Sequence, residues 1–421
     1  MKKPRIVPRS SLIASLDIGS SKICCFIARP GDDNKLKVIG IGHHLSRGVR
    51  GGTIIDMEQA ELAISTTVHA AEQMAGETIR TVIVNLSGGY PSSQTLSIEI
   101  PMNGREVTDH DVGRVLHQGG QFDSAADRRL IHSIPVGYSI DGAKGIRDPR
   151  GMYGERLGVD MHVITAASGA VRNITNCVAR CHLEVQSLVV SPYASGLSAL
   201  VDDEIDLGVT LIDMGAGTTN LAVFIDGHVV YTDSVPIGGS HVTNDLARGL
   251  STPLAHAERL KTLYGHCRVS PADEREMIQV PQVGEDHHQP TNPVPRSLLI
   301  GIIQPRLEET FELVRTRLEQ SGFDKVAGRR VVLTGGASQL AGVRELAQLV
   351  LDKQVRMGRP LHIDGLADAT NGPAFATAAG LLTFAAQTEV EMSEMRKERV
   401  TSLQASNGLL GRVSYWLKEN F

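Results

Sequence analysis

The chain has 421 residues and a formal net charge of −5, with 41% hydrophobic and 21% charged residues. This length is too great for one small core and favours about two to four compact units of an ordinary folded protein. A mildly negative molecule does not attract nucleic acid or an anionic membrane as a whole, and no basic stripe with interleaved aromatic residues predicts a nucleic-acid partner. Any attraction to a membrane therefore has to be local.

The five cysteines indicate a reducing compartment. Cys24 and Cys25 are adjacent in a strand-like run, and Cys177 and Cys181 are four apart in a helical pattern without a second pair of ligands, so buried apolar roles are favoured over a metal site. Residues 1–15 contain no apolar stretch typical of a signal peptide, and no run reaches the roughly 18 apolar residues of a membrane-spanning helix. We expect a cytosolic protein, or one bound to the cytosolic face of a membrane.

The N-terminal part reads as a mixed α/β layer. Residues 12–28 predict a strand, a tight turn and a second strand, and residues 37–43 predict a third strand. A helix is expected from Met57 to Ala75, followed by a strand at 81–88. An antiparallel start followed by a crossover helix is typical of an α/β lobe.

Residues 85–162 have a different pattern, which is consistent with a small α+β domain inserted into the lobe. Thr108 is a suitable N-cap, because its hydroxyl can accept a hydrogen bond from a backbone amide in the first turn of a helix. The expected elements are a strand at 92–100, a helix from Thr108 to about residue 121, strands at 129–140 and 157–167, and a glycine-rich loop at 148–155.

The α/β pattern then returns. The expected elements are a helix at 168–182, a strand at 185–190, a helix beginning near Pro192, a strand at 208–215, a turn, and a strand at 218–227. The last strand–turn–strand resembles the one at residues 12–28, about 196 residues earlier. Such an internal repeat indicates two duplicated lobes.

The C-terminal third begins with a loop rich in proline, histidine and acidic residues. His287 and His288 lie beside two acids in this loop, but a solvated loop is favoured over a metal site. The expected elements are this loop at 280–296, a helix at 299–321, a strand beginning at Arg330, a helix from about Leu340, a polar linker after Glu389 and an amphipathic end.

Two glycine turns follow acidic strand ends in the duplicated segments. Glycine and small hydroxyl residues let backbone N–H groups approach an anion closely. Asp17 and Asp213 can each hold Mg²⁺ through water, because Mg²⁺ prefers to keep several waters. The candidate phosphate-binding residues are Gly19, Ser20, Ser21 and Lys22 in the first turn, and Gly215, Ala216, Gly217, Thr218 and Thr219 in the second. Either turn alone is compatible with an ordinary strand connection, and the match between them supports both.

Two further segments complete a candidate nucleotide site. A strand ending in two glycines before a helix lets the backbone pack flat against a ring or a phosphate. An acid and a lysine three residues apart project from one helix face, where they can hold a ribose and an adenine edge or form only a surface salt bridge. These residues are Gly335, Gly336 and Ala337, and Gly239, Glu258 and Lys261. The chain has no GxxxxGK motif and no GxGxxG opening a helix after the first strand, which disfavours P-loop and dinucleotide folds.

The order of these segments resembles the actin, heat-shock-70 and sugar-kinase superfamily, and within it the FtsA family of bacterial cell-division proteins. The segment SPYASG at 191–196 is similar to the helix that links the lobes of the superfamily. DPRGMYGERL and the amphipathic end separate the FtsA family from actins, MreB-type filament proteins and chaperones. The motifs that carry the resemblance are ASLDIGSSKIC, SRGVRGGTIIDME, DPRGMYGERL, LIDMGAGTTNLAVF, VPIGGSHVTNDLA and LTGGASQLAG.

The resemblance implies an α/β, actin-like two-lobed ATPase fold with an inserted small α+β subdomain (1C) and a C-terminal amphipathic helix. The implied divisions are lobe I at 1–84, 163–197 and 361–388, subdomain 1C at 85–162, lobe II at 198–227 and 304–360, subdomain 2B at 228–303, a flexible linker at 389–406 and a membrane-binding helix at 407–421.

The resemblance also implies that the protein binds ATP with Mg²⁺, forms filaments with itself and tethers FtsZ polymers to inner-membrane lipids at the division septum. The FtsZ C-terminal peptide would bind subdomain 2B, and late division proteins would bind subdomain 1C. Relatives carry Glu or Gln near the linking helix to orient the attacking water. Residues 187–191 contain neither a carboxylate nor an amide, so we expect ATP binding with slow hydrolysis.

Six apolar residues of the C-terminal segment fall within an arc of roughly 140° on a helical wheel. They are Leu409, Leu410, Val413, Trp416, Leu417 and Phe421. A helix of about 13 residues is roughly 20 Å long, so it would lie on a membrane rather than across it. Full burial would give about 9–18 kcal/mol, against an ordering cost of about 1 kcal/mol per residue. One tail should therefore bind weakly, and many tails on one filament strongly. A terminal helix that packs on protein is the alternative.

Two other functions remain open. A metabolite kinase on the same fold would need a catalytic Asp between the lobes, and the sequence offers no clear candidate. A pilus-assembly relative would share the inserted subdomain but lack the C-terminal helix.

Overall fold

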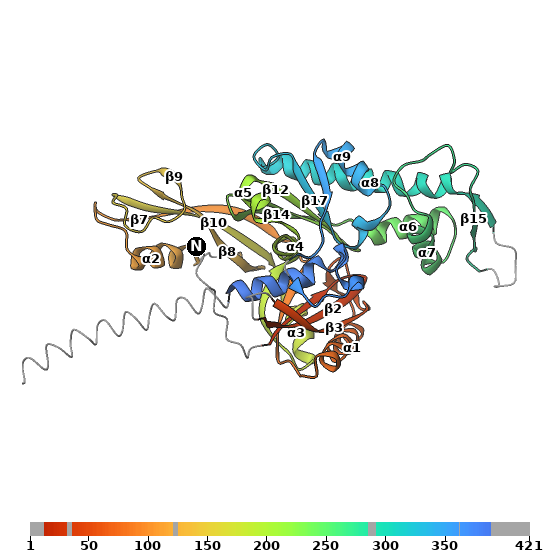
Figure 1. Ribbon diagram of the computed structural model, residues 1–421, viewed down its shortest axis with the longest axis horizontal. Coiled ribbons are helices and arrows are strands. Elements are labelled where there is room, and N and C mark those ends of the chain that lie inside the picture. Colours follow the sequence, from red (N-terminus) through yellow and green to blue (C-terminus); the bar gives the residue numbers. More distant parts are fainter. Residues whose placement is uncertain (1–11, 32–35, 121–124, 285–291, 362, 389–421) are drawn as a thin grey trace, which may run out of the picture.

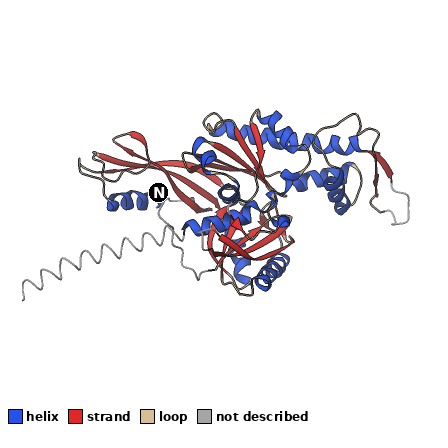
Figure 2. Ribbon diagram, viewed as in Figure 1, coloured by secondary structure: helices blue, strands red, loops and turns tan. Residues whose placement is uncertain are grey.

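Two lobes form a central body in the computed structural model, and a long insert projects from one end of it (Figure 1). The structure describes residues 12–31, 36–120, 125–284, 292–361 and 363–388. Each lobe contains a sheet that is covered by helices, as the colouring by secondary structure shows (Figure 2).

Lobe I is built on a sheet with the strand order β11-β6-β1-β2-β3-β19. The strands are β1 (Ile13–Ile18), β2 (Lys22–Pro30), β3 (Leu36–Leu45), β6 (Thr81–Leu86), β11 (Glu184–Val190) and β19 (Ile363–Asp364). Cys25 of β2 packs in the cluster formed with helices α1 (Met57–Ala75) and α3 (Ser168–Arg180). Cys24 and Phe26 pack instead with the helical residues 376–388. Because successive side chains of a strand point to opposite faces, both faces of this sheet are buried.

Lobe II repeats this arrangement in a sheet of order β14-β13-β12-β17-β18. The strands are β12 (Val209–Met214), β13 (Thr219–Ile225), β14 (His228–Val235), β17 (Arg330–Thr334) and β18 (Gln354–Met357). β12 pairs antiparallel with β13 and parallel with β17, as β1 pairs with β2 and β6. The predicted duplication of lobes is therefore confirmed. The helices of this lobe are α5 (Asp202–Leu207), α6 (Gly239–Gly249), α7 (Leu254–Tyr264), α8 (Arg296–Ser321) and α9 (Val343–Leu351).

Helix α4 (Ser191–Ala199) lies between the lobes. A Cβ atom on Gly380 would lie 1.7 Å from the carbonyl oxygen of Ala194, so the helical residues 376–388 pack directly on the backbone of α4. A Cβ atom on Gly196 would lie 2.2 Å from the Phe224 ring of β13. Glycine at these two positions allows α4 to lie in close contact with elements of both lobes.

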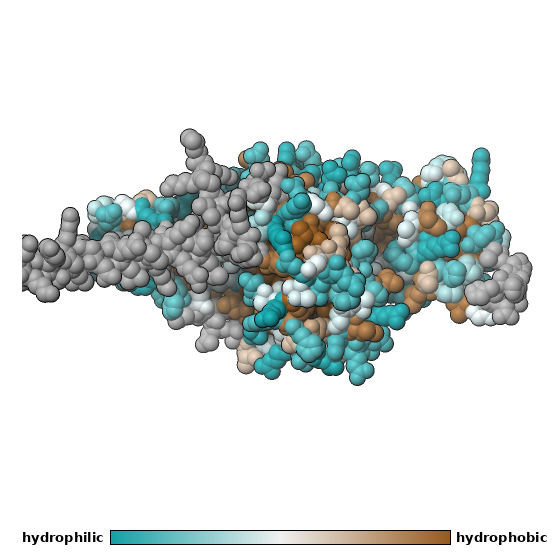
Figure 3. Space-filling model, turned by 60° about the horizontal axis from the view of Figure 1, so that its bottom comes forward, coloured by the Kyte–Doolittle hydropathy of each residue, from teal (hydrophilic) through white to brown (hydrophobic). Residues whose placement is uncertain are grey.

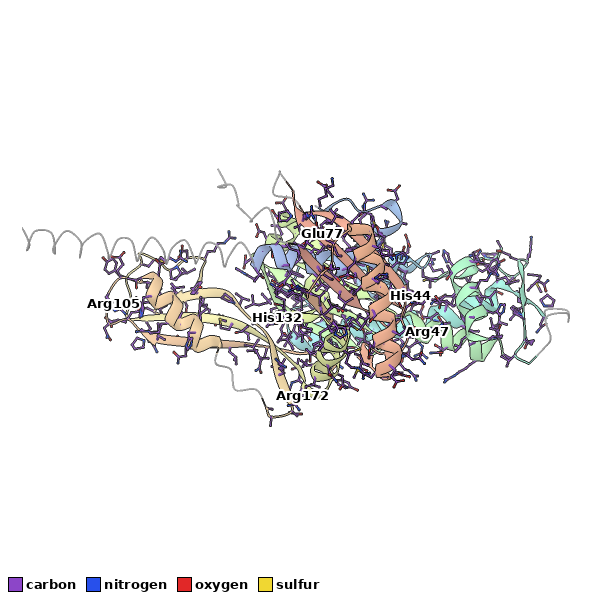
Figure 4. All side chains as sticks on the ribbon, turned by 90° about the horizontal axis from the view of Figure 1, so that it is seen from below. His44, Arg47, Glu77, Arg105, His132 and Arg172 are labelled. Carbon is purple, nitrogen blue, oxygen red and sulfur yellow. The ribbon has the colours of Figure 1, made fainter. Side chains whose placement is uncertain are left out.

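The insert comprises a four-stranded antiparallel sheet of order β7-β10-β8-β9 and one helix. Its elements are β7 (Ser92–Pro101), α2 (Asp109–Gly120), β8 (Arg128–Ile140), β9 (Ala143–Ile146) and β10 (Arg156–Ala167). Figure 4 shows Arg105 near the far end of the insert and His132 where the insert joins the body. His132 Nε2 accepts a 3.2 Å hydrogen bond from the N–H of Val190, next to α4. The insert therefore contacts lobe I close to the helix between the lobes.

The strand β9 was not predicted; it pairs with β8 in a hairpin and ends before the loop predicted at 148–155. Two expectations about local structure were wrong. The loop expected at 280–296 includes the strand β16 (Asn292–Pro295), which pairs with β15 (Met277–Val280). Prolines are tolerated in such a strand because its free edge needs no amide donor. The helix expected from Leu340 begins at Val343, after a 3-10 turn at Gly336–Gln339.

The predicted linker at 389–406 and the membrane-binding segment at 407–421 lie outside the described residues. Within the described part of the chain, no helix combines the length and apolar character needed to span a bilayer. Hydrophilic residues dominate the face in Figure 3, and apolar residues gather near its middle.

Candidate functional site

The connections β1–β2 and β12–β13 form the same turn. The N–H of Gly19 donates to the carbonyl oxygen of Lys22 at 3.0 Å, and the N–H of Gly215 donates to that of Thr218 at 2.9 Å. A Cβ atom would lie 2.8 Å from the same acceptor in the first turn and 3.0 Å in the second. Glycine leaves room for this hydrogen bond, so the repeated Asp-x-Gly pattern encodes a repeated turn.

The two turns meet between the lobes. A Cβ atom on Gly217 would lie 2.6 Å from Oγ of Ser20 and 2.8 Å from Cα of Gly51, which belongs to lobe I. The hydroxyl of Thr218 donates to the carbonyl oxygen of Ser87 at 3.4 Å. The lobe II turn therefore contacts three segments of lobe I.

A cavity of about 610 Å³ lies at this junction. Sixteen of the predicted residues line it: Asp17, Gly19, Ser20, Ser21, Lys22, Asp213, Gly215, Ala216, Gly217, Thr218, Gly239, Glu258, Lys261, Gly335, Gly336 and Ala337. Thr219 does not line it, which corrects the expectation. The Thr219 side chain is fully buried, and its hydroxyl donates to the carbonyl oxygen of Ile237 at 2.8 Å.

Burial controls the charges of the two aspartates beside the turns. Asp17 and Asp213 are 8% and 5% exposed. Burial raises the pKa of Asp17 to about 7; Lys22 opposes this shift and Asp213 adds to it. Burial also raises the pKa of Asp213, against hydrogen bonds from Ser195 and Thr377. Since each carboxylate is costly to ionise in the bare site, a bound cation would stabilise both.

Lys22 carries a buried ammonium group beside these acids. Its Nζ has no hydrogen-bond acceptor among the described residues and lies 3.1 Å from the centroid of the Phe375 ring. Burial lowers the pKa of Lys22. A buried cationic donor without an acceptor is costly unless a ligand supplies one, so this end of the cavity is suited to an anion.

Glu258 and Lys261 form a network at another wall of the cavity. Lys261 Nζ donates to Glu258 Oε2 at 2.7 Å, to Thr243 Oγ1 at 2.8 Å and to the carbonyl oxygen of Gly239 at 3.1 Å. The pair is therefore more than the surface salt bridge considered above, because contacts between α6 and α7 of lobe II fix it in place. Both side chains keep polar groups at the cavity, where ligand hydroxyls could bind.

The third glycine segment brings its backbone against the cavity. Gly335 has φ of 87°, and a Cβ atom there would lie 2.4 Å from Oδ1 of Asp213. Only glycine combines that backbone conformation with such a close approach. Gly336 and Ala337 begin the following 3-10 turn and also line the cavity.

Sequence reasoning missed several polar lining residues: Asn85, Ser87, Ser191, Asn220, Ser240, Arg296, Gln339 and Thr377. Asn85 is the most informative. Its Oδ1 accepts from the N–H of Ile18 at 2.7 Å, and its Nδ2 donates to Ser191 Oγ at 3.2 Å. The sequence did contain a sign of its role, because a side-chain amide near the end of the apolar strand β6 is unusual in a hydrophobic core.

The residues around Asp17 and Asp213 fit Mg²⁺. The available ligands are carboxylate and amide oxygens, which suit a hard cation that keeps its waters. Among the described residues, no three His, Cys, Asp or Glu side chains gather as a metal site. Asp17 and Asp213 would thus act with water and ligand oxygens rather than as a complete protein cage.

An adjoining cavity of about 840 Å³ shares Ser20, Gly217 and Thr218 with the first. It contains Asp245, the kind of residue that a metabolite kinase would need as a catalytic base. Arg306 binds this carboxylate with two nitrogen atoms, at 2.5 and 3.2 Å. This two-nitrogen ion pair engages both oxygens of the Asp245 carboxylate within the protein.

Comparisons with known proteins agree with this architecture. The family model described as "Cell division protein FtsA" matches residues 210–380, and that described as "SHS2 domain inserted in FTSA" matches residues 88–165. A cell division protein FtsA of Agrobacterium fabrum (strain C58) is 46% identical over 429 residues, which cover 100% of this chain and 97% of that protein.

Solved structures with low sequence identity show the fold. The PilM–PilN type IV pilus biogenesis complex matches with a TM-score of 0.63 and 19% identity, over 91% of this chain and 99% of that one. MreB5 of Spiroplasma citri bound to ADP matches with a TM-score of 0.54 and 14% identity, over 92% and 99%. The predicted actin-like fold with an inserted subdomain is thereby confirmed. The chain belongs to the FtsA family of cell division proteins.

Proposed function

We propose that the interlobe cavity binds ATP with Mg²⁺. The observation that carries this proposal is the pair of equivalent turns at the cavity together with the buried Nζ of Lys22, which has no acceptor among the described residues. Two sets of backbone N–H groups and one ammonium group form an environment suited to a chain of phosphates. The structural neighbour from Spiroplasma citri, which binds ADP, has the same fold.

Each wall of the cavity has a distinct task in this proposal. The turns at 19–22 and 215–218 hold the β- and γ-phosphates, and Asp17 and Asp213 hold Mg²⁺ through water. Glu258 and Lys261 bind the ribose and the edge of adenine, and Gly335 to Ala337 pack against the nucleotide. Mg²⁺ supplies charge neutralisation for the phosphates when it is bound.

The binding test compares two lysine variants. We expect Lys22→Met to weaken ATP binding at least ten-fold in isothermal titration calorimetry, because the variant removes a buried cation at the phosphate end. Lys37→Met, an exposed position in β3, serves as the control. Equal affinity of wild type and Lys22→Met for ATP would count against the proposed phosphate site.

Hydrolysis is proposed to be slow. The sequence offers no carboxylate or amide at 187–191, and the amide that the fold brings to Ser191 is that of Asn85. Both ends of the Asn85 amide are already engaged in protein hydrogen bonds. It is therefore poorly placed to orient an attacking water. A purified protein that turns over ATP many times per second would contradict this part of the proposal.

Because the chain belongs to a family of cell division proteins, it has a role in cell division. We propose that it does so as a filament-forming scaffold on the cytoplasmic face of the inner membrane, at the septum. There it would tether FtsZ polymers and help to recruit late division proteins through the insert. The predicted helix at 407–421 would supply the membrane contact, and the filament would let many tails act together.

The proposed binding region for the FtsZ C-terminal peptide is the segment 228–303. Exposed apolar side chains on three of its elements support this choice, because large apolar residues in solvent often mark protein contacts. They are Leu254 and Leu263 of α7, Met277 of β15 and Leu298 of α8.

The proposed membrane anchor is tested by co-sedimentation of FtsZ with lipid vesicles, in the presence of the full chain or of a chain lacking residues 407–421. Only the full chain should bring FtsZ to the vesicles, and FtsZ recruitment by the shortened chain would contradict the proposed anchor.

A further inference from the structure

Two hydroxyl groups from outside lobe II hold one oxygen of the Asp213 carboxylate. Ser195 Oγ donates to Asp213 Oδ2 at 2.8 Å, and Thr377 Oγ1 donates to the same oxygen at 3.1 Å. The two hydroxyls lie 2.9 Å apart. Ser195 belongs to the interlobe helix α4, and Thr377 to the helical residues 376–388 of lobe I. The carboxylate at the end of β12 is thus fixed from across the boundary between the lobes.

The other oxygen of the same carboxylate is left for a ligand. No described residue donates a hydrogen bond to Asp213 Oδ1, although both Asp213 and Gly335 line the cavity. A Cβ atom on Gly335 would lie 2.4 Å from Oδ1. Glycine at this position therefore keeps open the space around the unengaged oxygen. The carboxylate has one anchored oxygen and one that no protein donor satisfies.

Ser198, on the same helix, shows what a purely structural hydroxyl looks like. Its Oγ donates to the carbonyl oxygens of Ala376 and Ser195, at 2.7 and 3.2 Å. It is as deeply buried as Ser195 and lies one turn away, but it makes no contact with Asp213. Ser195 and Ser198 therefore differ in the group that they hold rather than in burial or location.

We propose that Ser195 and Thr377 are positioning residues that present Oδ1 of Asp213 to the Mg²⁺ of the bound nucleotide. This inference rests on the proposed nucleotide site. Groups that hydrogen-bond to a metal-binding carboxylate fix its orientation, and their loss typically lowers metal affinity about 10–100-fold. Because both donors lie outside lobe II, the orientation of this carboxylate depends on how the lobes pack together.

The test separates Mg²⁺-dependent binding from nucleotide binding. ADP affinity is measured by calorimetry in EDTA and in excess Mg²⁺ for the full chain, and the ratio of the two dissociation constants gives the Mg²⁺ enhancement. The variants are Ser195→Ala, Thr377→Val and their double variant, with Ser198→Ala as the matched control. Thr377→Ser retains a hydroxyl and should restore the behaviour of the wild type. Thermal melting of the free proteins is the second readout.

We expect the double variant to lose at least ten-fold of the Mg²⁺ enhancement, while its ADP affinity in EDTA and its melting temperature stay close to those of Ser198→Ala. An unchanged enhancement in the double variant would overturn the inference. So would an equal loss in Ser198→Ala, or a failure of Thr377→Ser to restore the enhancement. If the wild type binds no nucleotide in either buffer, the proposed function fails and this inference fails with it. If the wild type shows the enhancement and the variants keep it, only the inference fails.

Discussion

His162 Nε2 lies 2.6 Å from Oγ of Ser93, and this pair joins the insert to lobe II. On the other side of the ring, His162 Nδ1 lies 2.9 Å from the carbonyl oxygen of Val229 in β14. Ser93 Oγ also accepts the N–H of Thr232 at 3.2 Å. Burial lowers the pKa of His162 to about 4, so the ring is neutral at physiological pH, with Nδ1–H donating to Val229 and Nε2 accepting from Ser93. Two side chains of the insert thus satisfy backbone groups on the edge strand of lobe II.

Removal of the Ser93 hydroxyl should loosen this edge. We expect Ser93→Ala to speed hydrogen exchange of the Thr232 amide about five-fold or more, because the lost hydrogen bond is worth about 1 kcal/mol. Exchange measured by NMR or by mass spectrometry of β14 peptides checks this. Ser97→Ala is the control, since Ser97 lies on the same strand but bonds to Asp160 within the exposed part of the insert. Equal exchange of the Thr232 amide in both variants would show that the contact does not hold β14.

Gly217 limits how closely the lobes can approach. Gly217→Ala should destabilise the protein by about 1–3 kcal/mol, because its methyl group would overlap Ser20 and the backbone of Gly51 in the opposite lobe. Gly113→Ala in α2 is the matched control: no atom lies within 4 Å of its ideal Cβ, and alanine favours a helix by about 0.5–1 kcal/mol. Urea unfolding should therefore shift in opposite directions for the two variants. A shift in the same direction for both would argue against a tight contact between the lobes.

Asp17 makes the ligand-free protein sensitive to pH. Its pKa is about 7 in the fold and 3.8 in the unfolded chain, so the unfolded state releases its proton first as pH rises. This group therefore lowers stability progressively between about pH 4 and pH 7, and Asp17→Asn removes that loss. Without nucleotide or metal, the variant should be more stable than the wild type at pH 8, by at most about 4 kcal/mol, and no more stable at pH 4.

Urea unfolding of both proteins at several pH values measures this difference. Glu312→Gln, an exposed position on α8, controls for the loss of a charge and should leave the pH dependence as it is in the wild type. A constant difference between wild type and Asp17→Asn from pH 4 to pH 8 would contradict a buried, hard-to-ionise carboxylate.

Two charged variants test the predicted C-terminal helix. Trp416→Glu should greatly reduce sedimentation of the protein with phospholipid vesicles, because it places a charge within the apolar arc. At about 100° per residue, Tyr415 falls on the opposite side of the wheel. Tyr415→Glu therefore adds the same charge and removes an aromatic ring, yet should retain most of the binding. Unchanged lipid binding by Trp416→Glu would refute the assignment.

Local sequence determined the elements whose ends are encoded by adjacent residues. Helix α1 begins at Met57 and ends at Ala75 as predicted. Asp56 caps its first turn by accepting from the N–H of Gln59 at 3.1 Å, and Gly76 ends it with φ of 70°. The turns after Asp17 and Asp213 are also encoded locally. Glycine two positions after each aspartate permits the hydrogen bond that closes the turn. Repetition of that pattern in one chain predicted two duplicated lobes.

Only the tertiary structure decided which side chains line the cavity or hold its lining residues in place. Asn85, Ser195 and Thr377 come from three separate elements, and their contacts with Ile18, Ser191 and Asp213 span 18 to 164 positions of sequence. No local pattern encodes such pairs, because they depend on how the helices and sheets pack. The inward orientation of Thr219 is similar: its motif placed it among phosphate-binding residues, but strand alternation turned its hydroxyl toward the carbonyl oxygen of Ile237. The sequence determined the two glycine turns at the cavity, and packing between the lobes decided which groups hold the cavity residues in place.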